Sequence, residues 1–456
     1  MSYDIAIIGG GVVGTAIARE LSRYALKTVL VEARPELGDE SSKGNSALMC
    51  SGVDVPAGTL ERRLVRRGYA RYCAEAPTMG LPIRKVGAIV LAWTEEQEVI
   101  LNRDLADAHE DGFAAEALAS AEIYRRWPHF GPGIRCGLWL PDEAIVDPFS
   151  TPHAYALDAL ANGVEIRRAW RVEHAEPLPA GWRLLGSNGH LDARCVVNAG
   201  GIRGDEVDAL AGYGDFEIRP RRGQYMILDK SARAIHDVIA MPAPTPSTRG
   251  ILIAPTIFGN VLVGPTAEDV TDRDDRRVTQ DGLAQLRRAI ATIAPALADQ
   301  PVNTIFAGMR PATQFREYQI IPRLAQRWLT VAGIRSTGLS ASLGIAEHVV
   351  GLLIPALFDV RRKADGQPVI VPDLSETSRR PWQVASRIQC DPAYAEMVCH
   401  CERISMGEIR DALASPLAPT TLGGLKRRTR VMFGRCQGFY CGARVQALLD
   451  DQAAAR

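Results

Sequence analysis

Two sets of residues in this chain have the types and spacing that cofactor chemistry requires. Residues 9–14 read Gly-Gly-Gly-Val-Val-Gly and contain the pattern G-x-G-x-x-G. Such a turn lets the backbone approach the pyrophosphate of a dinucleotide at a helix N-terminus, where free N–H groups attract anions. Near the C-terminus, four cysteines form two close pairs, which suit an iron–sulfur cluster or a structural zinc ion. The members of this second set are Cys399, Cys401, Cys436 and Cys441.

Three predicted elements surround the glycine motif. Residues 3–8 form a short apolar run with β-branched side chains, which predicts a buried parallel strand. Residues 12–24 repeat apolar side chains with helical periodicity, and residues 28–32 predict a second strand. The sequence therefore predicts a βαβ unit with the glycine turn between its first strand and its helix.

Each residue of the motif has an expected role in that unit. Gly9 permits the tight turn, Gly11 admits the pyrophosphate, and Gly14 lets the helix pack on the strand. Glu32 ends the second strand 18 residues after Gly14, where a carboxylate binds a ribose 2′-OH and disfavours NADP. The motif alone leaves FAD and NAD open.

Three later segments favour a cofactor that extends far beyond its first ribose. The polar loop at 41–52, SSKGNSALMCSG, follows Glu32 within ten residues. The turns at 197–201 and 333–339 follow predicted strands and can also approach the cofactor.

The cysteine spacing favours iron–sulfur over zinc. Cys399-x-Cys401 is a C-x-C pair, whereas zinc sites more often use C-x2-4-C pairs. Zinc stays the alternative at this point. The basic run at 426–430 between the pairs has three interpretations, which are charge compensation for an anionic cluster, a docking surface, or a solvated helix end.

Length and composition exclude several classes of protein. A chain of 456 residues predicts two to four domains, and 46% apolar with 23% charged residues is an ordinary globular balance. The net charge of zero argues against a nucleic-acid binder. Neither a signal peptide nor a run of 18 uncharged apolar residues is present, so we expect a cytoplasmic protein without a transmembrane segment, with peripheral membrane attachment left open. Motifs of zinc proteases, serine hydrolases and P-loop NTPases are missing.

The rest of the chain mixes strands and helices. Further strands are predicted at 86–93, 181–186, 195–201, 223–229 and 328–334, and helices at 60–76, 151–162, 280–293 and 341–357. Residues 363–390, rich in Pro, Ser and charge, predict a linker. We therefore divide the chain into an oxidoreductase domain at 1–362, the linker, and a metal-binding domain at 391–456.

These motifs resemble those of FAD-dependent dehydrogenases of the D-amino-acid-oxidase superfamily, in particular the flavin subunit of anaerobic glycerol-3-phosphate dehydrogenase and L-2-hydroxyglutarate dehydrogenase. The resemblance runs through the glycine motif, SSKGNSALMCSG, VDPF (146–149), VVNAGG, GMRPA (308–312) and GIRSTGLSAS (333–342). The C-terminal stretch resembles a bacterioferritin-associated-ferredoxin-type [2Fe–2S] domain, which makes the four cysteines cluster ligands.

The resemblance implies an α/β (α+β) fold, in which a Rossmann-like FAD-binding domain is interleaved with a mixed-sheet substrate domain, followed by a small helical [2Fe–2S] domain. It implies hydride removal to flavin N5 from a carbon that bears OH or NH, with electrons leaving through the cluster to a partner subunit, an electron carrier or a quinone. The implied FAD-binding residues are Gly9, Gly11, Gly14, Glu32, Ser42, Asn45, Ser46, Val172, Gly200, Gly338 and Leu339.

Four residues are candidates for substrate chemistry. Arg310 in GMRPA matches the family arginine that binds an anionic substrate group, and an internal ion pair is its structural alternative. Tyr225 and Arg335 are expected to face the same pocket. Cys50 occupies the position of a family histidine, as a reactive thiol or as a small apolar filler.

Two departures from the family pattern bear on the substrate. Where glycerol-phosphate enzymes have a segment like HSGxR, this chain has CSGVDV, without the histidine or the arginine. A small anionic hydroxy compound, such as a 2-hydroxy acid or a polyol phosphate, is the predicted substrate. The alternatives are an amino or imino acid of the opine type, or a non-catalytic electron-transfer or assembly subunit. An NADH-using reductase is disfavoured because no second G-x-G-x-x-G follows in mid-chain.

Overall fold

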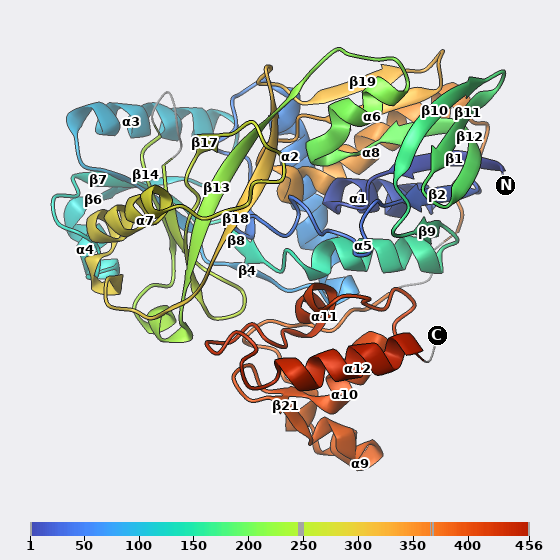
Figure 1. Cartoon of the computed structure of the whole chain (residues 1–456). Coiled ribbons are helices and arrows are strands. Elements are labelled where there is room, and N and C mark those ends of the chain that lie inside the picture. The colour runs from blue at the N-terminus through green and yellow to red at the C-terminus, as the bar shows by residue number, and fades with distance from the viewer. Residues whose placement is uncertain (1, 245–249, 365, 367–368, 455–456) are drawn as a thin grey trace.

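The computed structural model describes the chain except residues 1, 245–249, 365, 367–368 and 455–456. Three of the undescribed positions, 365 and 367–368, belong to the predicted linker. The described residues form two large sheets with helices on their faces, and a small separate unit lies below them (Figure 1).

The first sheet has a parallel centre, in which β1 lies between β12 and β2, and it carries the glycine turn at the end of β1. β9 extends the parallel part beside β2, and β20 does so beside β12. Antiparallel strands β10, β11 and β19 complete it. Its strands are β1 (Ser2–Ile8), β2 (Thr28–Val31), β9 (Glu165–Arg167), β10 (Val172–Leu178), β11 (Gly181–Gly186), β12 (Gly189–Asn198), β19 (Gln319–Arg323) and β20 (Trp328–Ala332).

The second sheet is mixed, and its strands come from segments between those of the first sheet, so the two units are interleaved as expected. Its longest pairing joins β13 and β18. Its strands are β5 (Ala88–Ala92), β6 (Glu116–Ala119), β7 (Cys136–Leu140), β13 (Ile218–Leu228), β14 (Ile239–Pro242), β15 (Leu252–Pro255), β16 (Val261–Gly264), β17 (Glu268–Asp269) and β18 (Val302–Thr313). A small sheet consists of β3 (Leu48–Met49), which lies within the segment 41–52, β8 (Ala144–Val146) and β4 (Ile83–Lys85).

The helices pack mainly around the first sheet. The central helix α8 packs against α1 and α2, and α1 also packs against α5. The other helices cover the second sheet or connect strands. The helices of this part are α1 (Val12–Leu21), α2 (Leu60–Glu75), α3 (Glu95–Glu110), α4 (Ser120–Arg126), α5 (Ser150–Ala161), α6 (Gly204–Leu210), α7 (Gln280–Ile293) and α8 (Gly338–Leu357).

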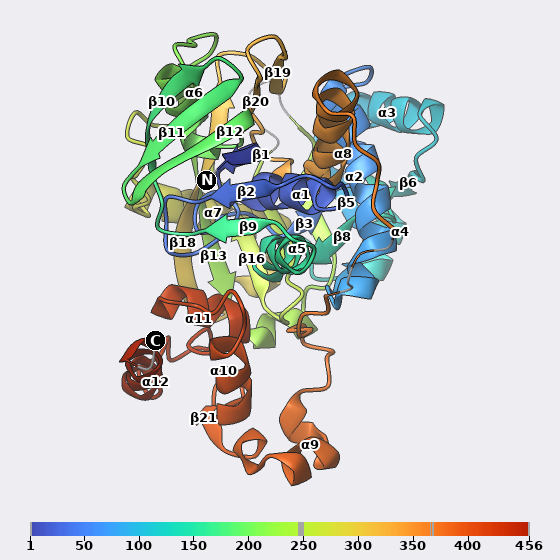
Figure 2. The same cartoon turned by 90° about the vertical axis from the view of Figure 1, so that its right-hand side faces the viewer.

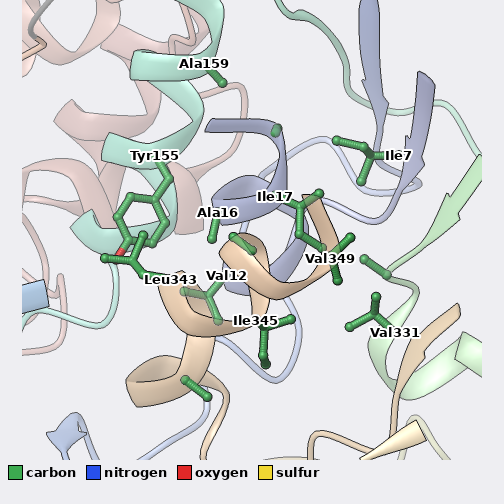
Figure 3. Close-up of a cluster of buried hydrophobic side chains, with 14 of the residues drawn as sticks. Ile7, Val12, Ala16, Ile17, Tyr155, Ala159, Val331, Leu343, Ile345 and Val349 are labelled. Atoms are coloured by element: carbon green, nitrogen blue, oxygen red, sulfur yellow. The ribbon is translucent and has the colours of Figure 1, made fainter. Parts of the chain in front are cut away.

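The main core fills the space between these helices and the first sheet. Ile17 and Ala16 of α1 contact the layer formed by Ile345 and Val349 of α8 and by Tyr155 of α5 (Figure 3). All five side chains are fully buried. Among the helices of the described residues, α8 alone is long and apolar enough to cross a membrane, and here 56% of that window is buried inside the molecule.

The C-terminal unit has its own small core, and it lies beneath α5 and β9 in both views (Figures 1 and 2). The predicted linker is not wholly irregular, because α9 (Ala385–Cys390) forms at its end. The elements of the unit are β21 (Met397–Cys399), β22 (Ile404–Ser405), α10 (Met406–Leu413), α11 (Leu422–Thr429) and α12 (Gly442–Ala454).

Candidate functional site

The backbone of the glycine turn is tightly packed at Gly9 and Gly14 and can be approached at Gly11. A Cβ at Gly9, whose φ is +110°, would lie 2.4 Å from the carbonyl oxygen of Ala199, and a Cβ at Gly14 would lie 1.9 Å from that of Gly9. A Cβ at Gly11 would meet only the Ser42 hydroxyl, at 3.3 Å. The first turn of α1 carries no acidic residue. This geometry fits the pyrophosphate of a dinucleotide, because the backbone at Gly11 can be approached and the helix N-terminus favours an anion.

We expect Gly14→Ala to weaken FAD binding by roughly 10- to 100-fold, since a displacement of about 1 Å in a preorganised site has effects of that size. The new methyl group would push α1 away from β1. The affinity of apoprotein for FAD, measured by flavin fluorescence, checks this. Gly214→Ala is the control, because a Cβ at Gly214 meets no atom within 4 Å. Equal FAD affinities in both variants would contradict this explanation of the turn.

Glu32 holds the glycine turn from the neighbouring strand end. Its carboxylate accepts hydrogen bonds from the backbone N–H groups of Gly10 and Arg34, both at 2.7 Å. Burial raises the pKa of Glu32, and these two N–H groups oppose that effect. Glu32 therefore lies where the sequence predicts the ribose acid, and its contact with ribose stays a prediction.

The loop at 41–46 connects this turn to the second sheet. The Ser42 hydroxyl accepts a hydrogen bond from Val12 N at 2.9 Å, and Ser41 donates to the carbonyl of Met309 at 2.7 Å. Asn45 donates to the Ser42 carbonyl and accepts from Ala47 N, so it shapes the loop. Ser46 lies in the same loop and is half-buried.

A glycine–glycine contact fixes that loop on β18, and sequence reasoning missed it. A Cβ at Gly308 would lie 1.8 Å from the carbonyl oxygen of Gly44, and a Cβ at Gly44 would lie 2.8 Å from the Cα of Gly308. The two backbones therefore touch, two residues before Arg310. The two glycines lie 264 positions apart in the sequence, so no local pattern marks the pair.

Arg310 and Tyr225 lie together on the paired strands β18 and β13. The Arg310 guanidinium donates to the carbonyl of Thr266 at 3.3 Å and interacts with the hydroxyl of Tyr225. It lies across Gly223, where a Cβ would be 2.8 Å from it. Burial raises the pKa of Tyr225, whose ring stacks on Phe306 at 4.7 Å. Within the described residues, the contacts of the Arg310 guanidinium are with the Thr266 carbonyl and the Tyr225 hydroxyl and include no carboxylate, so its charge is available to an anion.

Only some of the remaining predicted site residues lie near one another. Cys50 N donates to the hydroxyl of Ser340 at 2.9 Å, which places Cys50 against the first turn of α8, where Gly338 and Leu339 begin the helix. Gly200 lies against Gly9. Val172 begins β10 at the edge of the first sheet. Arg335 donates to the carbonyl of Arg316 at 3.4 Å, on the turn after β18, so its substrate contact stays a prediction.

Glu143 is a buried carboxyl group beside this region that the sequence did not indicate. In the sequence Glu143 looks like part of an ordinary acidic turn, yet its carboxylate accepts two hydrogen bonds from Ser51, next to Cys50. The donors are the backbone N–H of Ser51, at 3.0 Å, and its hydroxyl. Burial raises the pKa of Glu143 to about 7, and Asp54 adds to the effect.

The raised pKa predicts a pH-dependent stability. Between pH 4.5 and about 7 the folded protein holds a proton on Glu143 that the unfolded chain releases, so the free energy of unfolding falls as pH rises through this window. The loss amounts to roughly 3 kcal/mol. We expect Glu143→Gln to flatten this slope in urea titrations, whereas Glu173→Gln, at an exposed position, should keep it. An unchanged slope in Glu143→Gln would exclude this group as its source.

The four C-terminal cysteines meet as two pairs. Cys401 interacts with Cys436, and Cys399 with Cys441. The backbone N–H groups of Tyr440, Gly438 and Phe439 point at the Cys436 sulfur and lower its pKa.

The pairing and the backbone donors together suit a two-iron cluster. Each iron of a [2Fe–2S] cluster takes two thiolates, and N–H groups directed at sulfur stabilise the bound anionic centre. Four thiolates that meet as two pairs therefore fit the two irons of such a cluster.

Comparison with known proteins agrees with this geometry. The family described as "FAD dependent oxidoreductase" matches residues 4–352, and the "BFD-like [2Fe-2S] binding domain" matches residues 397–451. A glycerol 3-phosphate dehydrogenase of Caloramator mitchellensis is 31% identical over 98% of this chain and 94% of its own length. One subunit of the anaerobic glycerol-3-phosphate dehydrogenase of Escherichia coli is 27% identical over 98% of this chain and 88% of its own. The FAD-bound L-α-glycerophosphate oxidase of Mycoplasma pneumoniae superimposes with a TM-score of 0.76, at 25% identity, over 81% of this chain and 98% of its own.

Proposed function

Because this chain belongs to the FAD-dependent oxidoreductase family and carries a BFD-like [2Fe–2S] binding domain, we propose that it is a dehydrogenase of a small anionic hydroxy compound. Bound FAD supplies hydride acceptance at N5, and the cluster supplies one-electron transfer away from the flavin. The observation that carries the proposal is Arg310, a guanidinium beside Tyr225 without an acid partner among the described residues.

Two side chains position the substrate in this proposal. The guanidinium of Arg310 binds the carboxylate or phosphate, since its planar fork can donate two parallel hydrogen bonds. The hydroxyl of Tyr225 fixes the direction of that guanidinium and orients a polar group of the substrate. The loop at 41–46, held by Gly44 on Gly308, closes the space between β18 and the glycine turn.

The proposed substrate class rests on the positive charge of Arg310 and on the names of the relatives. The Caloramator and E. coli relatives are named for glycerol 3-phosphate, which supports a polyol phosphate. Cys50 and the lack of an arginine in 50–55 support a smaller acid, such as a 2-hydroxy acid. Both are anionic hydroxy compounds.

Electrons leave at the exposed side of the cluster domain. Cys401 is exposed, and the side chains of Phe439 and Tyr440, next to Cys441, are 84% and 82% exposed. The E. coli relative is named as one subunit of its enzyme, which supports a partner subunit in the role of acceptor, with a separate carrier or a quinone as the alternatives. We place the protein in the cytoplasm, at the membrane surface if the acceptor is a quinone.

An anaerobic substrate panel with a one-electron dye as acceptor tests the proposal. The panel contains sn-glycerol 3-phosphate, 2-hydroxy acids, and the corresponding amino acids. We expect dye reduction with a hydroxy acid or a polyol phosphate, and slow peroxide formation in air. Full-rate oxidation in air with stoichiometric peroxide would refute the dehydrogenase, and turnover of amino acids alone would favour the amine alternative.

A further inference from the structure

The basic run at 426–430 is buried between the cluster domain and the FAD-binding part of the chain. The side chains of Arg427, Arg428 and Arg430 are only 13%, 9% and 7% exposed. Arg427 pairs with Asp39 at 2.7 Å. Helix α11, which carries most of the run, lies directly beneath α5 and β9 (Figures 1 and 2). The run is therefore an internal docking surface and not a solvated helix end.

The carboxylate of Glu36 lies at the centre of this interface, with a side-chain exposure of 1%. One of its oxygens accepts hydrogen bonds from the N–H groups of Thr420 and Thr421, at 2.7 and 3.1 Å, and from both their hydroxyls. Its other oxygen faces Arg428 at 3.4 Å. A Cβ at Gly424 would lie 2.3 Å from the carboxyl group, so a glycine is needed there.

This carboxylate also matches the electrostatics of α11. Thr421 is the N-cap of the helix, so Glu36 places a negative charge where the helix has its partial positive charge. Burial of a carboxylate is unfavourable unless it is fully hydrogen-bonded. Here four donors surround one oxygen, and two cations, Arg428 and Arg168, lie 3.4 and 3.8 Å from the other. Glu36 therefore keeps these hydrogen bonds only when the domain is docked in this orientation.

The other end of the run connects to the cluster cysteines. Arg430 lies 3.8 Å from the ring centre of Phe258 and pairs with Glu402, which follows Cys401. Phe433, three residues before Cys436, stacks on Phe149 at 5.5 Å. The interface between the two domains thus extends from Glu36 to residues next to the cluster ligands.

The loop that carries Glu36 contacts the glycine turn as well. It begins at Glu32, which binds Gly10 N, and Gly38 N donates to the Gly10 carbonyl at 2.9 Å. Its far end is Ser42, which binds Val12 N. One short segment therefore contacts both the dinucleotide turn and the cluster domain.

We propose that Glu36 is a positioning residue that locks the cluster domain onto the FAD-binding domain and so fixes the distance between flavin and cluster. The proposal rests on the proposed function in one respect, that single electrons pass from the flavin to the cluster within this chain. No bond forms or breaks at Glu36, and its role is geometric.

The test compares Glu36→Gln and Glu36→Ala with Glu116→Gln, an exposed control on β6, in FAD- and cluster-loaded protein. Trypsin cleavage after Arg427 and Arg428, whose side chains the interface buries, reports undocking. We expect cleavage roughly 10- to 100-fold faster in both Glu36 variants, as expected for the loss of charge-assisted hydrogen bonds. The control should match the wild type. Cleavage at the wild-type rate in both Glu36 variants would overturn the proposal.

A second readout follows electrons and needs no substrate. Photoreduction of the flavin by deazaflavin and light, followed at the cluster absorbance, should show transfer at least tenfold slower in Glu36→Gln, with both cofactors still bound. Unchanged transfer would overturn the proposal. Loss of FAD with normal docking would also overturn it, because Glu36 would then support only the segment next to the glycine turn. If wild-type protein transfers no electrons to the cluster, the proposed function fails while the cleavage test of Glu36 still stands.

Discussion

Replacing Cys436 by serine is expected to remove the cluster and nearly all electron transfer to one-electron acceptors, while FAD stays bound. Cys436 pairs with Cys401, and three backbone N–H groups point at its sulfur. A serine hydroxyl cannot take the place of the thiolate in these contacts. We expect a loss of more than roughly 100-fold in acceptor reduction, because even an outer-shell partner costs a metal site up to that factor. Iron content, the visible spectrum and dye reduction measure it.

The matched control for this change is Cys390→Ser, at an exposed cysteine of α9 outside the two pairs. It should keep the cluster. The Cys436 variant should also unfold its C-terminal unit more easily, because binding of a metal centre contributes to the folding free energy of so small a unit. A full iron content in Cys436→Ser would remove this cysteine from the ligand set.

Replacing Arg310 by alanine should lower kcat/KM for the anionic substrate by roughly 1000-fold, or about 4 kcal/mol, since truncating one partner of a buried charge pair costs 2–5 kcal/mol. Lysine at this position should recover part of the loss, because it keeps the charge without the fork. Steady-state kinetics with the best substrate of the panel provides the measurement.

Arg219→Ala is the control for Arg310, because Arg219 lies on the same pair of strands, opposite Ala312, and is exposed. Dithionite should reduce the flavin equally in all variants, which separates substrate binding from cofactor damage. Unchanged kcat/KM in Arg310→Ala would show that the substrate anion is bound elsewhere, and the proposed site would then be wrong.

Features with local signals could be predicted from the sequence. The strand, glycine turn and helix at 3–24 follow from apolar periodicity and from the need for close backbone approach at Gly11 and Gly14, and the structure forms β1 and α1 there. The cysteine pairs were recognisable because a cluster needs its ligands at short spacing. The family and both cofactors follow from these motifs, and the comparisons confirm them.

Features that arise from long-range packing could not be predicted. β18 was not expected as a strand, because its sequence contains Gly308 and Pro311 and gains its stability from pairing along β13. Glu36 and Glu143 look like ordinary surface acids in the sequence, yet one lies at the N-terminus of α11 and the other against Ser51. Their burial depends on segments far away in the chain.

The path of electrons from substrate to cluster is the central claim for this protein. Anaerobic addition of the best anionic hydroxy substrate, followed by absorbance and electron paramagnetic resonance on the same sample, tests it most directly. We expect the flavin absorbance to bleach and the signal of a reduced [2Fe–2S] cluster to appear, both only in protein that retains Arg310. Bleached flavin without any cluster signal would contradict this path.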